Sequence, residues 1–384
     1  MTVAEDEPNV ATARGPDASE AGGILTVDLD ALVSNWRFLG QRVIPAECAA
    51  VVKADAYGCG LAPVVRALAG AGCKTFFVAH LAEGRAVRAE APEATVYVLN
   101  GLLPGTAERF AKARLRPVLS SLVEFAEWEA YCAATGWTGG AAVHVDTGMN
   151  RLGIRAVDCQ AVADRVRGTE GLVSLVMSHF ACAETPKHPL NKRQISTFHD
   201  VSRLFHGVPA SFANSSGIFL GHITDYDLVR PGVALYGVNP TPWQSNPMKP
   251  VVTLKGRILQ VREVTKGDTV GYGATWTAPV DARIAVVSIG YADGLPRAAA
   301  GSETEPGINA IVAGQRCPVA GRISMDLTAI DVTALPTDAV RRGDFATFIG
   351  DGITVDEVAR HAGTIGYEIL TSLGRRYRRV YVGG

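Results

Sequence analysis

Lys53 is the side chain of this chain that is best placed to act as a nucleophile. It follows the apolar run AVV (residues 50–52), which is typical of a short buried strand, and it precedes turn-forming residues that end such a strand. Partial burial at the mouth of a strand lowers the pKa of an amine, so more neutral amine is present to attack a carbonyl or form a Schiff base. The alternative is a lysine that buries only its aliphatic stem and keeps its charge in water.

Four later segments carry further ionisable or small polar side chains where apolar runs end. They are HVDTGMNRLG (144–153), SHF (178–180), NSSG (214–217) and RPGV (230–233). Each has a purely structural interpretation, because Asn214 could cap a helix, His179 could be a buried core histidine and Arg230 could form a surface ion pair. If the runs are parallel strands of one barrel, these side chains meet at the rim where barrel enzymes carry their active sites.

The elements needed for such a barrel follow one another along the chain. After a leading strand at 24–28 and a helix at 31–41, helical patterns such as 104–113 and 191–205 separate most of eight strand-like runs. The eight runs are 49–54, 75–79, 95–99, 116–119, 142–145, 173–177, 211–213 and 227–229. This alternation predicts an α/β fold whose N-terminal domain, residues 23–249, is a parallel (β/α)8 barrel with Lys53 at the end of its first strand.

A proline-rich segment at 240–247 marks the end of this alternation. Beyond it, strand-like runs such as 251–254, 258–261, 284–289 and 345–349 are separated by glycine-containing turns with little helix between them. Residues 250–384 are therefore predicted to form a mainly β C-terminal domain. Residues 1–22 are acidic, small and interrupted by proline, which is typical of a disordered tail and of neither a signal peptide nor a membrane anchor.

The composition excludes several classes of protein. A chain of 384 residues with 47% hydrophobic residues is long enough for one large domain and a smaller one. Its net charge of -1 gives no case for binding nucleic acid or an anionic membrane. The seven cysteines are scattered, without CxxC or zinc spacing, which indicates reduced core residues of a cytoplasmic protein and predicts no metal site.

The loops after the seventh and eighth strands are where many barrels bind phosphate. Here these loops offer the hydroxyl groups of Ser215 and Ser216 and backbone N–H groups around Gly217, Gly232 and Val233. A lysine across the barrel mouth from a phosphate site suggests pyridoxal phosphate, held through its phosphate and through a Schiff base.

Five motifs together resemble those of alanine racemase. They are VVKADAYG (51–58), VDTGMNRLG (145–153), RPG (230–232), GYGAT (271–275) and GYADG (290–294). The likeness extends over about residues 23–382, in order and at suitable spacing. It implies a fold-type III pyridoxal phosphate enzyme, an isomerase that acts on alanine and forms a head-to-tail homodimer with shared active sites. It further implies a role in supplying D-alanine for peptidoglycan, with a catabolic role as the alternative.

The resemblance also assigns roles to individual residues. Lys53 would be the Schiff-base lysine and one acid/base group, and Tyr272 of the other subunit would be the second. The substrate would contact Arg151, the backbone N–H of Met325 from the second subunit, and Tyr291 at the mouth. The cofactor-binding residues would be Lys53, Tyr57, Arg151, His179, Asn214, Ser215, Arg230, Gly232, Val233 and Tyr367.

Within that set, Arg230 matches the residue that faces the pyridine nitrogen, and His179 matches the one that supports it. Arg151 matches a residue that contacts both the cofactor phenolate and the substrate carboxylate. Because a guanidinium group gives up no proton, it leaves the pyridine nitrogen neutral, which limits delocalisation into the ring and stray transamination. The match to phosphate-binding positions covers Tyr57, Ser215, Gly232, Val233 and Tyr367.

Racemisation removes a proton from one face of the α-carbon and returns a proton to the other, so two groups on opposite faces are the minimum. Lysine and tyrosine side chains both have pKa values near 10 in water. A site that uses them at neutral pH must therefore lower these values, and clustered arginines would help.

Three positions depart from the family pattern. Many relatives carry a carbamylated lysine seven residues before the arginine of the Met-Asn-Arg motif, whereas this chain has His144, on which no such carbamate can form. Whether His144 orients Arg151 directly, through water or through an anion stays open. Ser324 stands where cysteine is frequent, and Cys59 stands where histidine is frequent.

Three other functions remain as alternatives. A broader amino-acid or serine racemase would share the scaffold, but Tyr291 and Tyr367 near the mouth favour a substrate as small as alanine. A decarboxylase of basic amino acids shares the domain order but does not explain the Tyr272 motif. A non-catalytic pyridoxal phosphate carrier would normally end after the barrel, so the β-rich domain argues against it.

Overall fold

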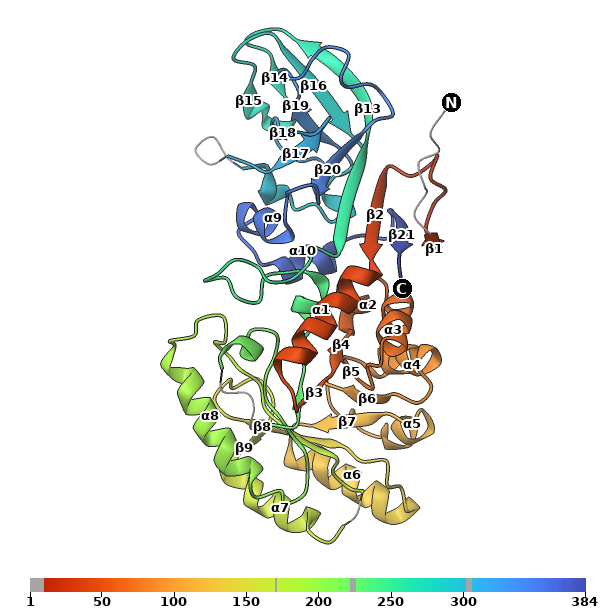
Figure 1. Ribbon diagram of the computed structural model, residues 1–384, viewed down its shortest axis with the longest axis vertical. Coiled ribbons are helices and arrows are strands. Elements are labelled where there is room, and N and C mark those ends of the chain that lie inside the picture. Colours follow the sequence, from red (N-terminus) through yellow and green to blue (C-terminus); the bar gives the residue numbers. More distant parts are fainter. Residues whose placement is uncertain (1–9, 170, 222–225, 302–305) are drawn as a thin grey trace.

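Parallel strands from the first two thirds of the chain form a barrel, and mainly antiparallel strands from the last third form a second domain beside its mouth (Figure 1). The computed structural model describes residues 10–169, 171–221, 226–301 and 306–384. No helix in these segments is long and apolar enough to cross a membrane.

The barrel strands are short and parallel to one another. They are β3 (Glu47–Cys48), β4 (Ala50–Val51), β5 (Thr75–Val78), β6 (Thr95–Val98), β7 (Arg116–Leu119), β8 (Ala142–Asp146), β10 (Leu175–Met177), β11 (Ala210–Ser211) and β12 (Leu228–Val229). The first two are one strand interrupted at Ala49, whose N–H donates to the carbonyl of Val229 at 3.0 Å. Because β3 pairs with β12 and β4 pairs with β5, this strand closes the barrel. The predicted parallel barrel is therefore confirmed.

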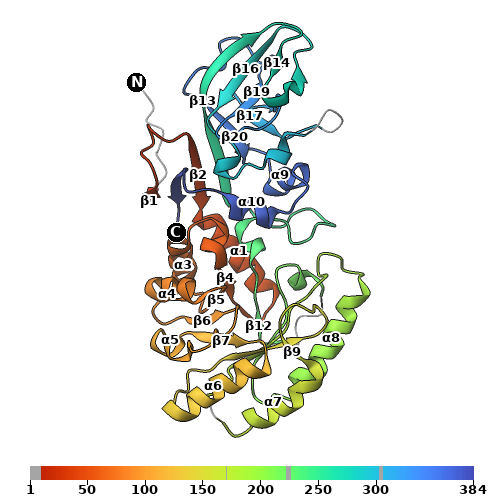
Figure 2. The same ribbon diagram turned by 180° about the vertical axis from the view of Figure 1, so that it is seen from behind.

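Helices cover the outside of the barrel, as Figure 2 shows from the reverse side. The helix N-termini are capped by side chains where the sequence provides them: Asp28 accepts the N–H of Ala31 at 2.8 Å, and Ser121 accepts that of Glu124 at 3.2 Å. The helices are α1 (Leu29–Arg42), α2 (Lys53–Tyr57), α3 (Leu61–Gly70), α4 (Leu81–Glu90), α5 (Ala107–Lys112), α6 (Leu122–Thr135), α7 (Cys159–Val166) and α8 (Pro189–Ser202). Shorter elements are β9 (Ile154–Arg155) and the 3-10 helices η1 (Ala156–Asp158), η2 (Gly217–Phe219) and η3 (Val233–Tyr236).

The second domain is built around the long strand β13 (Val252–Val264). This strand pairs antiparallel with β2 (Gly23–Asp28), β16 (Ala282–Val287) and β20 (Phe345–Ile349). The predicted mainly β character of this domain is confirmed. Its other elements are β14 (Thr269–Val270), β15 (Trp276–Thr277), β17 (Asn309–Val312), β18 (Gln315–Pro318), β19 (Thr328–Asp331), β21 (Arg378–Val382), α9 (Val355–His361), α10 (Gly366–Ser372), η4 (Tyr272–Ala274), η5 (Tyr291–Asp293) and η6 (Arg297–Ala300).

The N-terminal segment departs from the predicted domain organisation. Residues 23–28, expected at the start of the barrel domain, form β2 in the sheet of the second domain. Part of the expected disordered tail is also structured, because β1 (Val10–Arg14) pairs antiparallel with β21. The physical reason is that β21 would otherwise be an edge strand with unpaired backbone groups. Residues 1–9 of that tail lie outside the described residues.

Polar contacts hold the chain segment that leads out of the barrel and tie it to the second domain. The amide of Asn35 in α1 donates to the carbonyls of Leu235 and Lys249 at 3.2 and 2.9 Å and accepts the N–H of Lys249 at 2.8 Å. The carboxylate of Asp356 in α9 accepts the N–H of Asn239 at 3.0 Å. The next helix, α10, lies over the barrel mouth, where its Tyr367 lines the pocket (Figure 1).

Candidate active site

A pocket of about 650 Å³ opens at the carboxyl ends of the barrel strands. It brings together side chains that the sequence placed in the site from segments far apart in the chain. The predicted residues that line it are Lys53, Tyr57, Arg151, His179, Asn214, Ser215, Arg230, Gly232, Val233 and Tyr367.

Lys53 lies at a tight turn and not, as expected, at the end of the strand itself. Strand β4 ends at Val51, and Lys53 begins α2. The next four residues, Ala54 to Tyr57, have φ values of 54, 52, 54 and 54°. A left-handed turn of residues that carry a Cβ atom is unfavourable and is rarely this long. The strand therefore ends three residues before Ala54, where its apolar pattern predicted the end.

The environment of Lys53 favours its neutral form. Burial lowers the pKa of the Lys53 amine, the positive charge of Arg151 lowers it further, and the negative charge of Glu83 acts in the opposite direction. The expected depression of the lysine pKa by burial therefore agrees with the structure. A larger fraction of the amine is free to react with a carbonyl than in an exposed lysine.

Arg230 follows β12 and is only 3% exposed. Its terminal nitrogens donate to the carbonyl of Ser178 at 2.5 Å, to the carbonyl of Phe212 at 3.3 Å and to the hydroxyl of Ser211. Nδ1 of His179 lies 3.5 Å from the same guanidinium. Although burial lowers the pKa of Arg230 to about 9, the group remains charged at neutral pH.

Aromatic rings support Arg230 from inside the barrel. The guanidinium carbon lies 5.8 Å from the ring centre of Phe77, and that ring stacks on Tyr97 with centres 5.0 Å apart. Arg116 lies 5.5 Å over the Tyr97 ring and donates to its hydroxyl at 3.0 Å. This column of cations and π faces fills the barrel interior below the pocket and limits the movement of Arg230.

Two histidines in the pocket are neutral. Burial, with help from Arg230 and Arg151, lowers the pKa of His144 to about 4. The same causes lower the pKa of His179 well below its ordinary value. His144 is buried, and its Nδ1 lies 3.5 Å from the hydroxyl of Ser120. A neutral imidazole in this position can accept a hydrogen bond from an arginine without adding positive charge.

The loop that carries Arg151 is shaped by one carboxylate. Oδ1 of Asp146 accepts the N–H groups of Gly148, Met149 and Asn150 at 2.9, 3.0 and 3.1 Å. This turn directs the exposed Arg151 over the barrel mouth, where it lines the pocket. The types and order of these residues follow from the sequence, whereas the direction of the loop does not.

Hydroxyl and backbone N–H groups form a cradle on the other side of the pocket. The Ser215 hydroxyl accepts the N–H groups of Gly232 and Ala234 at 2.9 and 3.3 Å. The ring of Tyr57 stacks 4.7 Å from that of Tyr236, and Tyr367 from α10 lies 6.2 Å from Tyr57. Burial raises the pKa values of both Tyr57 and Tyr367, so both hydroxyls remain protonated hydrogen-bond donors.

Gly232 is required by the geometry of this cradle. A Cβ atom at this position would lie 2.3 Å from the Tyr57 hydroxyl, which is much closer than two such atoms can approach. The absence of a side chain lets the Tyr57 hydroxyl lie against this loop, and the hydroxyl-bearing Ser215, Tyr57 and Tyr367 all line the pocket. These neutral hydroxyl donors fit a phosphate group, so the residues present are compatible with pyridoxal phosphate. Asn214 contributes less directly, because its side-chain oxygen accepts the N–H of Gly217 at 2.8 Å and caps η2.

Three predicted site residues lie outside this pocket. Tyr272, Tyr291 and Met325 belong to the second domain and are 71, 42 and 53% exposed. Tyr272 lies between β14 and β15, at the end of the second domain farthest from the barrel (Figures 1 and 2). These three side chains do not complete the pocket of their own chain.

Three residues in or beside the pocket were not predicted from the sequence. Asn100 and Glu184 line the same pocket, and Glu83 binds the turn after Lys53. The only sequence signal for Glu83 is its place three residues after His80, the N-cap of α4, which is typical of a capping box. Glu184 and Asn100 carry no motif, so their position follows from the fold alone.

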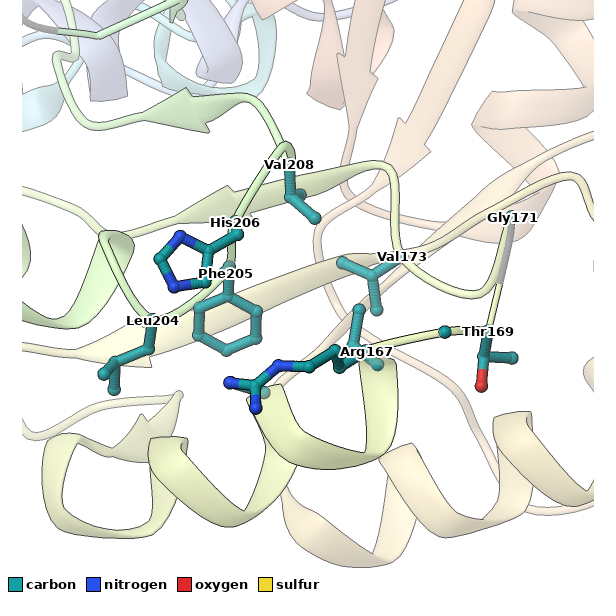
Figure 3. Close-up of a pocket in the computed structure, with 11 residues that line it drawn as sticks. Arg167, Thr169, Gly171, Val173, Leu204, Phe205, His206 and Val208 are labelled. Carbon is teal, nitrogen blue, oxygen red and sulfur yellow. The ribbon is translucent and has the colours of Figure 1, made fainter.

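A separate hollow of about 370 Å³ lies at the opposite ends of the barrel strands. Figure 3 shows Arg167 from the end of α7 and His206 from the segment after α8 on its walls, with apolar side chains between them. It contains none of the predicted site residues. Active sites of barrels lie at the carboxyl ends of the strands, so this hollow is not the candidate site.

A barrel rim that unites a partly buried lysine, a buried arginine and a cradle of neutral donors defines a lysine-dependent barrel enzyme. The family models of the alanine racemase N-terminal and C-terminal domains match residues 27–240 and 251–381. The chain belongs to the alanine racemase family, a family of isomerases, as its motifs predicted.

Individual relatives agree with this assignment. An alanine racemase from Methylobacterium nodulans is 53% identical over 367 residues, which cover 95% of this chain and 98% of that protein. The crystal structure of alanine racemase from Bartonella henselae, with covalently bound pyridoxal phosphate, has a TM-score of 0.88 at 38% identity over 94% of this chain and all of that one. The biosynthetic alanine racemase of Pseudomonas aeruginosa has a TM-score of 0.86 at 36% identity, over 94% of this chain and all of that one.

Proposed function

We propose that this chain is a pyridoxal phosphate-dependent alanine racemase that uses Lys53 and Tyr272 of a partner subunit as its two acid/base groups. The proposal rests on one observation: a partly buried lysine, a charged arginine and a cradle suited to phosphate line the same pocket. Membership of the alanine racemase family supports the same reaction.

Different residues of the pocket would bind different parts of the cofactor. Tyr57, Ser215, Gly232, Val233 and Tyr367 bind the phosphate, and Asn214 positions the adjoining 3-10 helix. Arg230, which is held by its buried partners and lies beside His179, would face the pyridine nitrogen of the bound cofactor. When bound, pyridoxal phosphate supplies an electron sink for negative charge at the α-carbon. Because a guanidinium group does not give up its proton, Arg230 would leave the pyridine nitrogen neutral, which would limit how far negative charge spreads into the ring.

The second acid/base group comes from another copy of the chain. Tyr272 is exposed, belongs to the end of the second domain away from its own barrel, and does not line the pocket that contains Lys53 of the same chain. A head-to-tail homodimer would bring this hydroxyl to the face of the substrate opposite Lys53. The exposure of Tyr291 and Met325 is consistent with the same partner surface.

The substrate is alanine. Arg151 binds its carboxylate, and Met325 of the partner subunit contributes a backbone N–H to the same group. Tyr291 of the partner subunit narrows the mouth together with Tyr367, which leaves room for a methyl side chain. We further propose that the enzyme acts in the cytoplasm and supplies D-alanine for peptidoglycan.

Incubation with single enantiomers tests the reaction. Purified protein with pyridoxal phosphate should bring either L-alanine or D-alanine to an equal mixture, measured by optical rotation or chiral chromatography. Serine and larger amino acids should react much more slowly. Comparable rates with serine would instead favour a broader racemase, and release of carbon dioxide would favour a decarboxylase.

A further inference from the structure

We propose that Glu83 is a positioning residue for Lys53. Its carboxylate holds the turn that follows Lys53, and its negative charge counteracts the positive charge of Arg151 near the Lys53 amine. This inference rests on the proposed role of Lys53 in catalysis. Glu83 belongs to no motif on which the sequence interpretation relied, and it does not line the active-site pocket.

Both oxygens of the Glu83 carboxylate are bonded to backbone N–H groups. Oε1 accepts the N–H of Ala54, the residue next to Lys53, at 2.7 Å. Oε2 accepts the N–H groups of Ala79 and His80 at 2.8 and 3.0 Å. The side chain therefore joins the catalytic turn to the end of β5 and the start of α4.

The capping box accounts for only one of these three hydrogen bonds. Glu83 is the third residue of α4, and its bond to the His80 N–H is the one expected in a capping box. The bond from Ala54 comes from a segment 29 residues earlier and adds nothing to the helix. This bond gives the first backbone N–H after Lys53 a hydrogen-bond acceptor.

The turn needs such external support because its backbone conformation is unfavourable. Four successive residues after Lys53 carry a Cβ atom and have positive φ values. Three contacts pin the segment: Glu83 binds it at Ala54, Asp55 accepts the N–H of Leu61 at 2.7 Å, and Arg379 donates to the carbonyl of Gly58 at 3.3 Å. Of these, the Glu83 contact is nearest to the lysine.

The charge of Glu83 also acts on the amine. Arg151, from the loop after β8, and Glu83, from α4, are the charged groups that act on Lys53, and they work in opposite directions. His179 faces the same pocket and is neutral. Removing the negative charge of Glu83 favours the neutral amine further, so Lys53 should lose its proton at lower pH.

The first test uses apoprotein, so it does not depend on racemase activity. The rate at which trinitrobenzenesulfonate labels Lys53 is measured against pH by mass spectrometry of the peptide that contains it. In Glu83→Gln the midpoint of this profile should move to lower pH than in the wild type. Glu90→Gln, in the same helix, removes a carboxylate that pairs with Arg66 at 2.7 Å and should leave the midpoint unchanged. An unchanged midpoint in Glu83→Gln overturns the electrostatic part of the proposal.

The second test separates positioning from helix capping. Glu83 also lines a surface pocket of about 590 Å³, together with Asp55, Gly60 and Arg375. In Glu83→Ala a small carboxylate can therefore enter from solvent and occupy the vacated position. The affinity of this variant for pyridoxal phosphate, measured by fluorescence quenching, should fall by about ten- to a hundredfold. Formate should restore much of the loss, and methanol should not.

The outcomes distinguish this inference from the proposed function. A folded Glu83→Ala protein with wild-type affinity, or one that formate does not rescue, would assign Glu83 to helix capping alone. If Glu83→Ala does not fold, the labelling profile of Glu83→Gln decides. Failure of the proposed function would appear elsewhere, as retention of covalently bound cofactor in Lys53→Ala.

Discussion

At the scale of single residues, burial and neighbouring charges prepare the site for chemistry near neutral pH. Burial and Arg151 lower the pKa of Lys53, while Arg230 stays charged despite being almost fully enclosed. The histidines beside them are neutral, so they do not add to the positive charge of the pocket. The pocket therefore holds fixed positive charge at the arginines and a lysine that can lose its proton.

Replacement of Lys53 tests its assignment as the lysine that binds the cofactor. In Lys53→Ala the visible absorption band of the lysine-bound cofactor should vanish, and racemase activity should fall by about 10⁴-fold or more. Borohydride treatment followed by mass spectrometry should find the cofactor on the Lys53 peptide in the wild type only. A variant that still carries reducible cofactor would show that another lysine has this role.

His144 leads to a prediction about bicarbonate. A carbamylated lysine, as in the relatives that carry one at this position, would lose activity when carbon dioxide is removed, whereas neutral His144 carries nothing that can be lost. Degassed enzyme, exposed to mild acid and returned to neutral pH, should match untreated enzyme in racemase rate. If added bicarbonate restores a lost rate, a lysine elsewhere in the site has been carbamylated.

The two acid/base groups should be distinguishable by isotope exchange. The two enantiomers lose their α-protons from opposite faces, and therefore to different bases. Tyr272→Phe should slow exchange of the α-proton of L-alanine by about 10²–10⁴-fold and affect D-alanine less. Solvent deuterium uptake into the unreacted enantiomer, followed by mass spectrometry, measures this asymmetry. Equal losses for both enantiomers would indicate a single base.

Many of the side chains that line the pocket could be predicted from the sequence, whereas the contacts that support them could not. Lys53, Arg230 and Ser215 follow apolar runs that end at one rim, and this spacing is visible in the chain. The column of Phe77, Tyr97 and Arg116 below Arg230 brings three strands together only in the folded barrel.

At the scale of elements, the site depends on how strands end. The apolar pattern predicted that the first barrel strand reaches Ala54, but β4 ends at Val51 because the backbone turns to positive φ after Lys53. Alanine and aspartate carry no strong signal for a left-handed turn, so this departure could not be found from the sequence. The contacts that hold the turn come from α4 and β21, which lie far away in the chain.

Gly232 offers a test of the cradle at this scale. In Gly232→Ala the new methyl group would displace the Tyr57 hydroxyl, which should remove one charge-assisted hydrogen bond to phosphate. Such a bond contributes about 1.5–3 kcal/mol, so pyridoxal phosphate affinity should fall roughly ten- to a hundredfold. Gly70→Ala is the matched control, because a Cβ atom at the end of α3 meets nothing within 4 Å. Equal affinities in both variants would show that Gly232 does not shape the phosphate site.

At the scale of the whole molecule, the two domains have separate tasks. The barrel and α10 of the same chain form the pocket, whereas the far end of the second domain presents Tyr272 to solvent. The sequence predicted both domains, but it placed residues 23–28 in the wrong one, because pairing of β2 with β13 joins segments more than two hundred residues apart. The resemblance, and no pattern in the chain, indicated that Tyr272 serves a partner.

Complementation between two inactive variants tests the shared site most directly. Lys53→Ala and Tyr272→Phe chains should each be nearly inactive alone. In a mixed head-to-tail dimer, one site combines the intact Lys53 of one chain with the intact Tyr272 of the other, and the second site carries both faults. With random pairing of equal amounts, about half the dimers are mixed, so activity should approach about one quarter of the wild-type value.

The measurement is the racemase rate after the two purified variants are refolded together, with subunit exchange verified by native mass spectrometry of differently tagged chains. We predict recovery towards about one quarter of wild-type activity, since each mixed dimer has one complete site. If Tyr272 served the Lys53 of its own chain, every site in the mixture would carry one fault. Exchanged dimers that stay inactive would therefore contradict the shared site.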